Sequence, residues 1–77
     1  MQAKTVRRTW QELVNDWLVA NERRQAWLAR KCKPPMGTAQ LSRLMTGDLP
    51  ATEYAIERIE EATGLSLKKV WKQQQAA

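Results

Sequence analysis

The residues best suited to chemistry lie in two short segments near the middle of the chain, Gln25 to Cys32 and Gly37 to Gly47. Read as two short helices around a tight corner, they place small polar and basic side chains on one helix face. A cationic surface lies beside that face, because basic residues cluster in the first segment and in the turn. This combination of shape and chemistry is suited to entering the DNA major groove.

Positive charge is concentrated in the same part of the chain. Thirteen Lys and Arg against eight Asp and Glu give a net charge of +5. Nine of the basic residues but only three of the acidic ones lie within residues 1–47. The distribution favours an anionic partner; ordinary solubility charge on a small domain is the alternative.

The composition limits the other classes of function. With no His and one Cys, the chain lacks the ligands of a structural zinc site and cannot form an intrachain disulfide, which is typical of a reducing compartment. No apolar run approaches about 18 residues, and no signal-peptide core is present, so we expect a cytoplasmic protein without a membrane span. Glu60 and Glu61 are adjacent and project in different directions. We therefore expect no catalysis, no cofactor, no metal and no small-molecule ligand.

Local patterns predict the first two helices. Thr9 and Glu12 fit a capping box, and apolar residues then recur at helical spacing, which predicts a helix to about residue 20. Asn21 suits the left-handed residue that ends a helix. A second helix is expected over about residues 23–33, where the following Pro-Pro pair stops it.

The rest of the chain continues the helical pattern. A third helix is expected from Gly37 or Thr38 to Gly47, a fourth from Thr52 to Gly64, and a fifth from Leu67 to about Lys72. We predict an all-α fold, a compact bundle of four to five short helices in one domain over residues 9–72. Residues 1–8 are expected as a flexible basic arm, or else a solvated tail, and residues 73–77 as a frayed C-terminal tail.

The order of residues resembles the lambda-repressor-like helix-turn-helix family, which includes phage repressors and Cro-type proteins. The resemblance covers about residues 10–67 and rests on Gln25, Leu28-Ala29, Leu41-Ser42-Arg43-Leu44, Gly47 and the stretch from Ala55 to Gly64. The turn Lys33-Pro34-Pro35-Met36 departs from the family pattern, because it is two residues longer and lacks the usual glycine. Asp48 stands where family members often carry a basic or neutral residue near DNA phosphate.

The resemblance implies a set of DNA contacts, because the second helix of the motif enters the major groove in this family. By position, the base contacts are Thr38, Ala39, Gln40 and Arg43. Gln can bond to adenine, Arg to guanine, and the methyl groups of Thr and Ala can contact thymine. The implied phosphate contacts are Gln25, Arg24, Lys33, Ser42, Arg7 and Arg8. Ser42 alternatively reads a base or bonds back onto its own helix, and part of the basic set is alternatively a solvated face.

The tryptophans and the cysteine are expected to serve packing. Trp10, Trp17 and Trp27 have the spacing of core residues, and Cys32 suits a small buried hydrophobic residue. Trp71, with Val70, is expected either at a dimer or partner contact or against the first helix.

These observations and the resemblance predict a sequence-specific DNA-binding transcriptional regulator. The expected form is a small phage- or prophage-type repressor, associated with the nucleoid in the cytoplasm of a bacterial or phage-infected cell. A homodimer would bind a pseudo-palindromic operator in the major groove through residues of about 37–46. The alternative is an antitoxin or co-regulator whose main role is to bind a protein partner.

Overall fold

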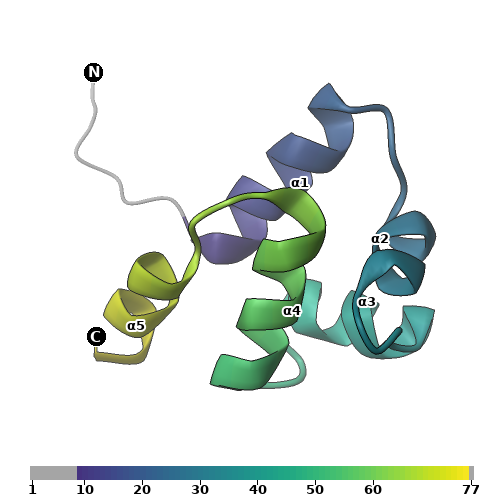
Figure 1. The fold of residues 1–77 in the computed structure, drawn as a ribbon. Helices are drawn as coiled ribbons and strands as arrows, with labels where there is room; N and C mark the ends of the chain where they lie inside the picture. Colours follow the sequence, from purple (N-terminus) through teal and green to yellow (C-terminus); the bar gives the residue numbers. More distant parts are fainter. Residues whose placement is uncertain (1–8, 77) are drawn as a thin grey trace.

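The computed structural model describes residues 9–76, and all regular structure within them is helical. The helices are α1 (Trp10–Ala20), α2 (Gln25–Lys31), α3 (Thr38–Thr46), α4 (Glu53–Thr63) and α5 (Lys68–Ala76). In Figure 1, α4 lies between the α2–α3 pair and α5, and it contacts both α2 and α5. The predicted all-α bundle of short helices is therefore confirmed.

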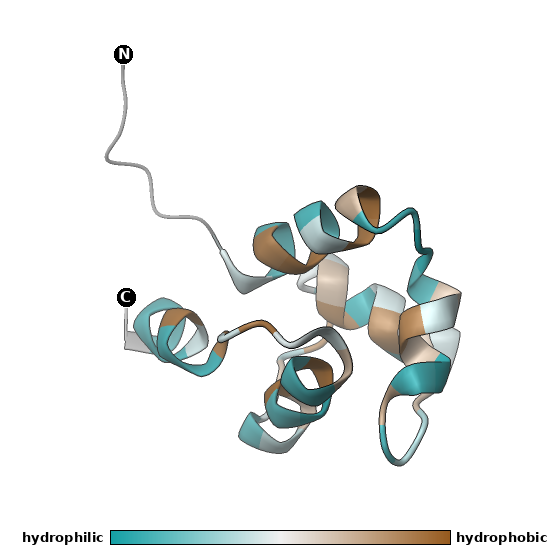
Figure 2. Ribbon diagram, turned by 45° about the horizontal axis from the view of Figure 1, so that its top comes forward, coloured by the Kyte–Doolittle hydropathy of each residue, from teal (hydrophilic) through white to brown (hydrophobic). Residues whose placement is uncertain are grey.

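One hydrophobic core joins the helices. Its buried residues come from all of α1 to α4 and from the segments before α3 and α5: Trp10, Val14, Leu18, Leu28, Ala29, Cys32, Met36, Leu41, Leu44, Ala55, Ile56, Ile59 and Leu67. The segment that joins α1 to α2 is hydrophilic throughout (Figure 2). None of the described helices has both the length and the apolar character needed to cross a membrane.

The predicted ends of α1, α3 and α4 agree with the structure. The capping box at α1 is formed: the Thr9 hydroxyl accepts from the Glu12 amide at 3.2 Å, and the Thr9 amide donates to the Glu12 carboxylate at 2.8 Å. Helices α3 and α4 end at Gly47 and Gly64, with φ of 88° and 81°. Glycine suits both ends, because a Cβ is disfavoured in the left-handed conformation.

The junction after α1 differs from the prediction. Asn21 has φ of −100°, and Glu22 takes the left-handed conformation instead, with φ of 55°. The Asn21 side chain explains the difference, because its amide donates to the Trp17 carbonyl at 2.8 Å and holds the residue against α1. The expectation that Asn21 is the left-handed residue is wrong.

Helix α2 is shorter than predicted at both ends. Arg24 is its extended N-cap, with ψ of 163°, and Cys32 is already extended, with ψ of 149°. The helix therefore spans seven residues instead of the predicted range 23–33. A proline disfavours the helical conformation in the residue before it, here Lys33. The chain leaves the helix one residue earlier, at Cys32. The Lys33–Pro34 peptide bond that follows is cis.

Helix α5 is longer than predicted, because residues 73–76, expected as part of a frayed tail, are helical. The Glu60 carboxylate accepts the two amides at the start of this helix, at 2.6 and 2.8 Å. Near its other end, the Gln74 side chain accepts from the Trp10 amide at 2.7 Å. Both contacts join residues distant in sequence, so a local pattern could not reveal them.

Candidate nucleic-acid interface

The outer face of α3, defined as Thr38, Ala39, Gln40 and Arg43, points to solvent, and all of its members are exposed. Helix α3 is amphipathic: Leu41 and Leu44 are buried on its inner side. Ala39 and Arg43 are four positions apart and so share one side of the helix. The residues predicted to contact bases therefore form one accessible surface of a helix that is anchored from behind.

Ser42 lies at the border between this face and the core and is half-buried. Its hydroxyl forms none of the hydrogen bonds found among the described residues. The bond back onto the helix is made instead by Thr46, whose hydroxyl donates to the Arg43 carbonyl at 3.1 Å. The Ser42 hydroxyl is thus left for an external partner, although only half of the side chain is accessible.

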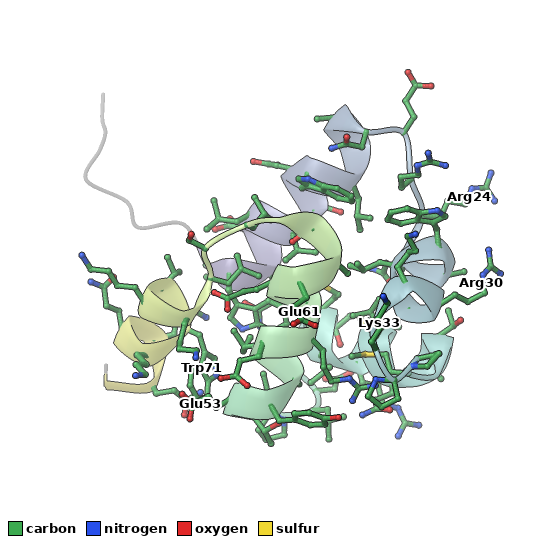
Figure 3. All side chains as sticks on the ribbon, viewed as in Figure 1. Arg24, Arg30, Lys33, Glu53, Glu61 and Trp71 are labelled. Carbon is green, nitrogen blue, oxygen red and sulfur yellow. The ribbon has the colours of Figure 1, made fainter. Side chains whose placement is uncertain are left out.

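The basic residues around α2 project away from the body of the protein. Arg24 and Arg30 both extend outward from the α2 side of the molecule (Figure 3), and Lys33 lies in the exposed turn that follows. Within the described residues, the ion pairs join Lys68 to α4 and involve none of these cations. Their positive charge is consequently available to an anionic partner. Arg7 and Arg8, the remaining predicted phosphate contacts, lie outside the described residues.

Two further cations of this region lie against a tryptophan. The guanidinium carbon of Arg23 and the ammonium of Lys31 lie 4.8 and 5.7 Å from the centre of the Trp27 ring. That ring stacks on Trp17, with 5.8 Å between the ring centres. Both tryptophans are half-buried and pack against the edge of the core, so the predicted core position holds fully only for Trp10, which is buried.

Gln25 has mixed surroundings. It is half-buried and opens α2, as predicted, but it lines a groove of about 380 Å³ together with Glu12 and Asp16 of α1 and the end of α3. Two carboxylates beside it lower the local positive potential. Its suitability for phosphate therefore rests on the side-chain amide and not on the charge of its surroundings.

Val70 and Trp71 are half-buried and pack against the core of the same chain. Trp71 lies where α5 faces α4 (Figure 3), and its indole nitrogen is buried without a hydrogen-bond partner in the described part of the molecule. The predicted alternatives for Trp71 were a dimer or partner contact and packing against the first helix; the structure packs it against the core on the side of α5 that faces α4. The part of each side chain left for a second copy or another protein is small.

Cys32 is buried at the end of α2, as predicted. Burial raises the pKa of its thiol, and the nearby Arg58 charge opposes the shift. The neutral thiol serves as a small packing residue. Among the described residues, no cluster of His, Cys, Asp and Glu is arranged to hold a metal ion.

Arg58 is a residue of interest that the sequence analysis did not single out. Its guanidinium donates to the Pro34 carbonyl in the turn between α2 and α3 and lies 5.1 Å from the centre of the Tyr54 ring. The pair of Tyr54 and Arg58, four positions apart on a helix, is visible in the sequence. The contact with Pro34, 24 positions away, depends on tertiary packing.

Comparison with known proteins adds no family to this description: no protein-family model, no curated protein and no solved structure matches the chain.

Proposed function

We propose that the chain is a sequence-specific DNA-binding transcriptional regulator, a small repressor of phage or prophage type. In this proposal α2, the turn and α3 act as a helix-turn-helix, and the outer face of α3 reads base edges in the major groove. A regulator of this kind acts in the cytoplasm, on the nucleoid.

The observation that carries the proposal is the pairing of an exposed polar helix face with nearby cations that form no ion pair with residues 9–76. Gln40 and Arg43 supply the amide and the guanidinium that read adenine and guanine. Arg24 and Lys33, near the two ends of α2, supply charges that can follow the phosphate backbone on either side. Phosphate contacts set the orientation of the protein, and base contacts set its sequence preference.

In this proposal the protein represses transcription by occupying its operator. Two copies binding a pseudo-palindrome place their recognition helices about 34–36 Å apart, one turn of DNA. A dimer on an operator that overlaps a promoter then excludes polymerase. The second copy contributes a second half-site, so the selected sequence itself reports whether the protein binds as a dimer.

The second candidate function, an antitoxin or co-regulator that mainly binds a protein, has less support. The partner-binding surface expected for that function consists of Val70 and Trp71, and both residues pack against the core of the same chain. The two functions also differ in their response to salt. Affinity for DNA carried by several phosphate contacts falls steeply as salt rises, whereas an apolar protein interface responds little.

The test is selection of bound sequences from a random duplex library at near-physiological salt. We expect a palindromic consensus whose half-site spacing reports the dimer. Enrichment of an asymmetric site contradicts the homodimer but keeps the DNA-reading function. If no sequence is enriched and binding disappears as salt rises, the sequence-specific function is wrong.

A further inference from the structure

The Arg58 side chain links α4 to the turn between α2 and α3. Its guanidinium donates to the Pro34 carbonyl and stacks over the ring of Tyr54, at 5.1 Å from the ring centre. Tyr54 and Arg58 lie one helical turn apart on α4, so the ring supports the guanidinium from its own helix. The arrangement holds the middle of the turn from outside α2 and α3.

The turn determines where α3 begins. Met36 is buried, and its amide donates to the Ala29 carbonyl at 3.0 Å, which fixes the end of the turn against α2. Gly37, the N-cap of α3, provides no side-chain hydrogen bond, and a Cβ at this position would meet nothing within 4 Å. The start of α3 therefore has no side-chain cap of its own and follows directly on the turn, while Leu41 and Leu44 anchor the rest of the helix in the core.

The Arg58 guanidinium is only partly hydrogen-bonded within the described part of the molecule. Its Nε atom is buried without a hydrogen-bond partner, and none of the ion pairs among the described residues involves it. A partly desolvated guanidinium with an unpaired donor is a poor means of stabilising a fold. What the side chain does provide is a fixed, planar hydrogen-bond donor aimed at a backbone carbonyl three residues before the N-cap of α3.

We infer that Arg58 is a positioning residue that sets the base preference of the protein without touching DNA. By holding the Pro34 carbonyl, it fixes the lengthened turn and, through it, the orientation of Thr38, Ala39 and Gln40. The role that we assign to Arg58 is to hold the turn through the Pro34 carbonyl and the Tyr54 ring, and not to bind phosphate itself. This inference rests on the proposed function, because it deepens the description of the same DNA-reading surface.

The experiment measures discrimination, defined as affinity for the selected duplex divided by affinity for a scrambled duplex of equal length. Arg58→Met keeps the aliphatic stem and removes the hydrogen bond. Lys69→Met, on the exposed surface of α5, removes the same charge without disturbing the turn and is the matched control. Circular dichroism during thermal unfolding establishes that each variant is folded at the temperature of the binding assay.

We expect Arg58→Met to reduce discrimination about tenfold, the factor for about 1.4 kcal/mol of lost orientation. Lys69→Met is expected to leave the affinity for both duplexes, and therefore the discrimination, unchanged. If Arg58→Met unfolds the protein, Tyr54→Ala is measured instead. The Tyr54 side chain is 55% exposed, so this variant is expected to fold. Because it removes the ring that supports the Arg58 guanidinium, we expect it to reduce discrimination two- to threefold.

The outcomes separate this inference from the function on which it rests. Loss of discrimination in Arg58→Met or Tyr54→Ala, with the control unchanged, supports the inference. Unchanged discrimination in a folded Arg58→Met variant overturns the inference and leaves the DNA-reading function intact. If Arg58→Met does not fold, unchanged discrimination in Tyr54→Ala overturns the inference in the same way. A wild-type protein that does not discriminate between the two duplexes overturns the proposed function itself.

Discussion

The charged residues at the two ends of the bundle are used differently. At the α4–α5 end, the Lys68 ammonium lies 2.7 Å from Glu57 and 3.6 Å from Glu53, and the hydrogen bond that it donates to Glu57 raises the pKa of Lys68. The Glu60 carboxylate in turn holds the start of α5. At the α2–α3 end, four cations form no ion pair within the described residues: Arg24, Arg30, Lys33 and Arg43.

At the α4–α5 end, one cation, Lys68, thus serves the fold, whereas Lys69 and Lys72 form no ion pair among the described residues. The four cations at the α2–α3 end differ from these two in lying on or next to α2 and α3, the proposed reading unit. Total charge cannot make the distinction, because both ends carry several basic residues. The distinction depends on whether a carboxylate lies beside each cation in the folded protein. Variants at the α4–α5 end should therefore change stability, and variants at the α2–α3 end should change binding.

The largest effect is expected at the outer face of α3. Arg43→Ala should cost about 1–3 kcal/mol of discrimination at one base pair, because a bidentate contact with guanine is lost. Competition between duplexes that differ at that position measures the loss. Arg43→Lys is the control, since it keeps the charge but cannot form the planar bidentate pair. An unchanged base preference in Arg43→Ala contradicts the proposed register of α3.

A smaller effect, on stability alone, is expected at Glu60. Glu60→Ala removes the acceptor for the amides of Leu67 and Lys68 at the start of α5 and should lower the free energy of unfolding by about 1–2 kcal/mol. Glu60→Gln keeps one acceptor oxygen and should lose less. Thermal and urea unfolding give the values. A change of base preference in either folded variant contradicts the division between the two ends.

A uniform but weaker effect on binding is expected at Lys33. Lys33→Ala removes a charge that has no ion pair in the described part of the chain. The change should reduce the slope of log affinity against log salt by about 1, equally for all sequences. Lys72→Ala, exposed on α5, is the matched change at the other end and should leave the slope unchanged. Titration of one duplex at several salt concentrations measures both slopes. Equal slopes for the two variants place Lys33 away from the phosphates.

The smallest effect is expected at Glu12, which lines the groove beside Gln25. Glu12→Gln should strengthen DNA binding about twofold at low salt, because one negative charge near the proposed phosphate path is removed. The capping box accepts Gln at this position, so the free energy of unfolding should change by less than about 1 kcal/mol. Glu53→Gln on α4 is the control. Weaker binding by Glu12→Gln places the phosphates elsewhere.

Local patterns were sufficient for most helices but not for their limits. The capping box at Thr9 and the glycines at 47 and 64 were predictable because their hydrogen bonds and backbone angles involve residues close in sequence. The end of α5 was not, since residues 73–76 are joined to α1 through Gln74. The sequence pattern also identified the exposed face of α3, because the burial of Leu41 and Leu44 on one side leaves Thr38, Ala39, Gln40 and Arg43 exposed on the other.

The sequence by itself determined the all-helical class, the amphipathic face of α3 and the excess of positive charge near α2, because all of these depend on residue type and spacing along one helix. Tertiary structure alone decided which cations have partners, that Trp71 packs within the monomer, and that Arg58 holds the turn before α3. These features depend on how helices distant in sequence pack against one another. Periodicity cannot encode that arrangement, since it describes each helix separately.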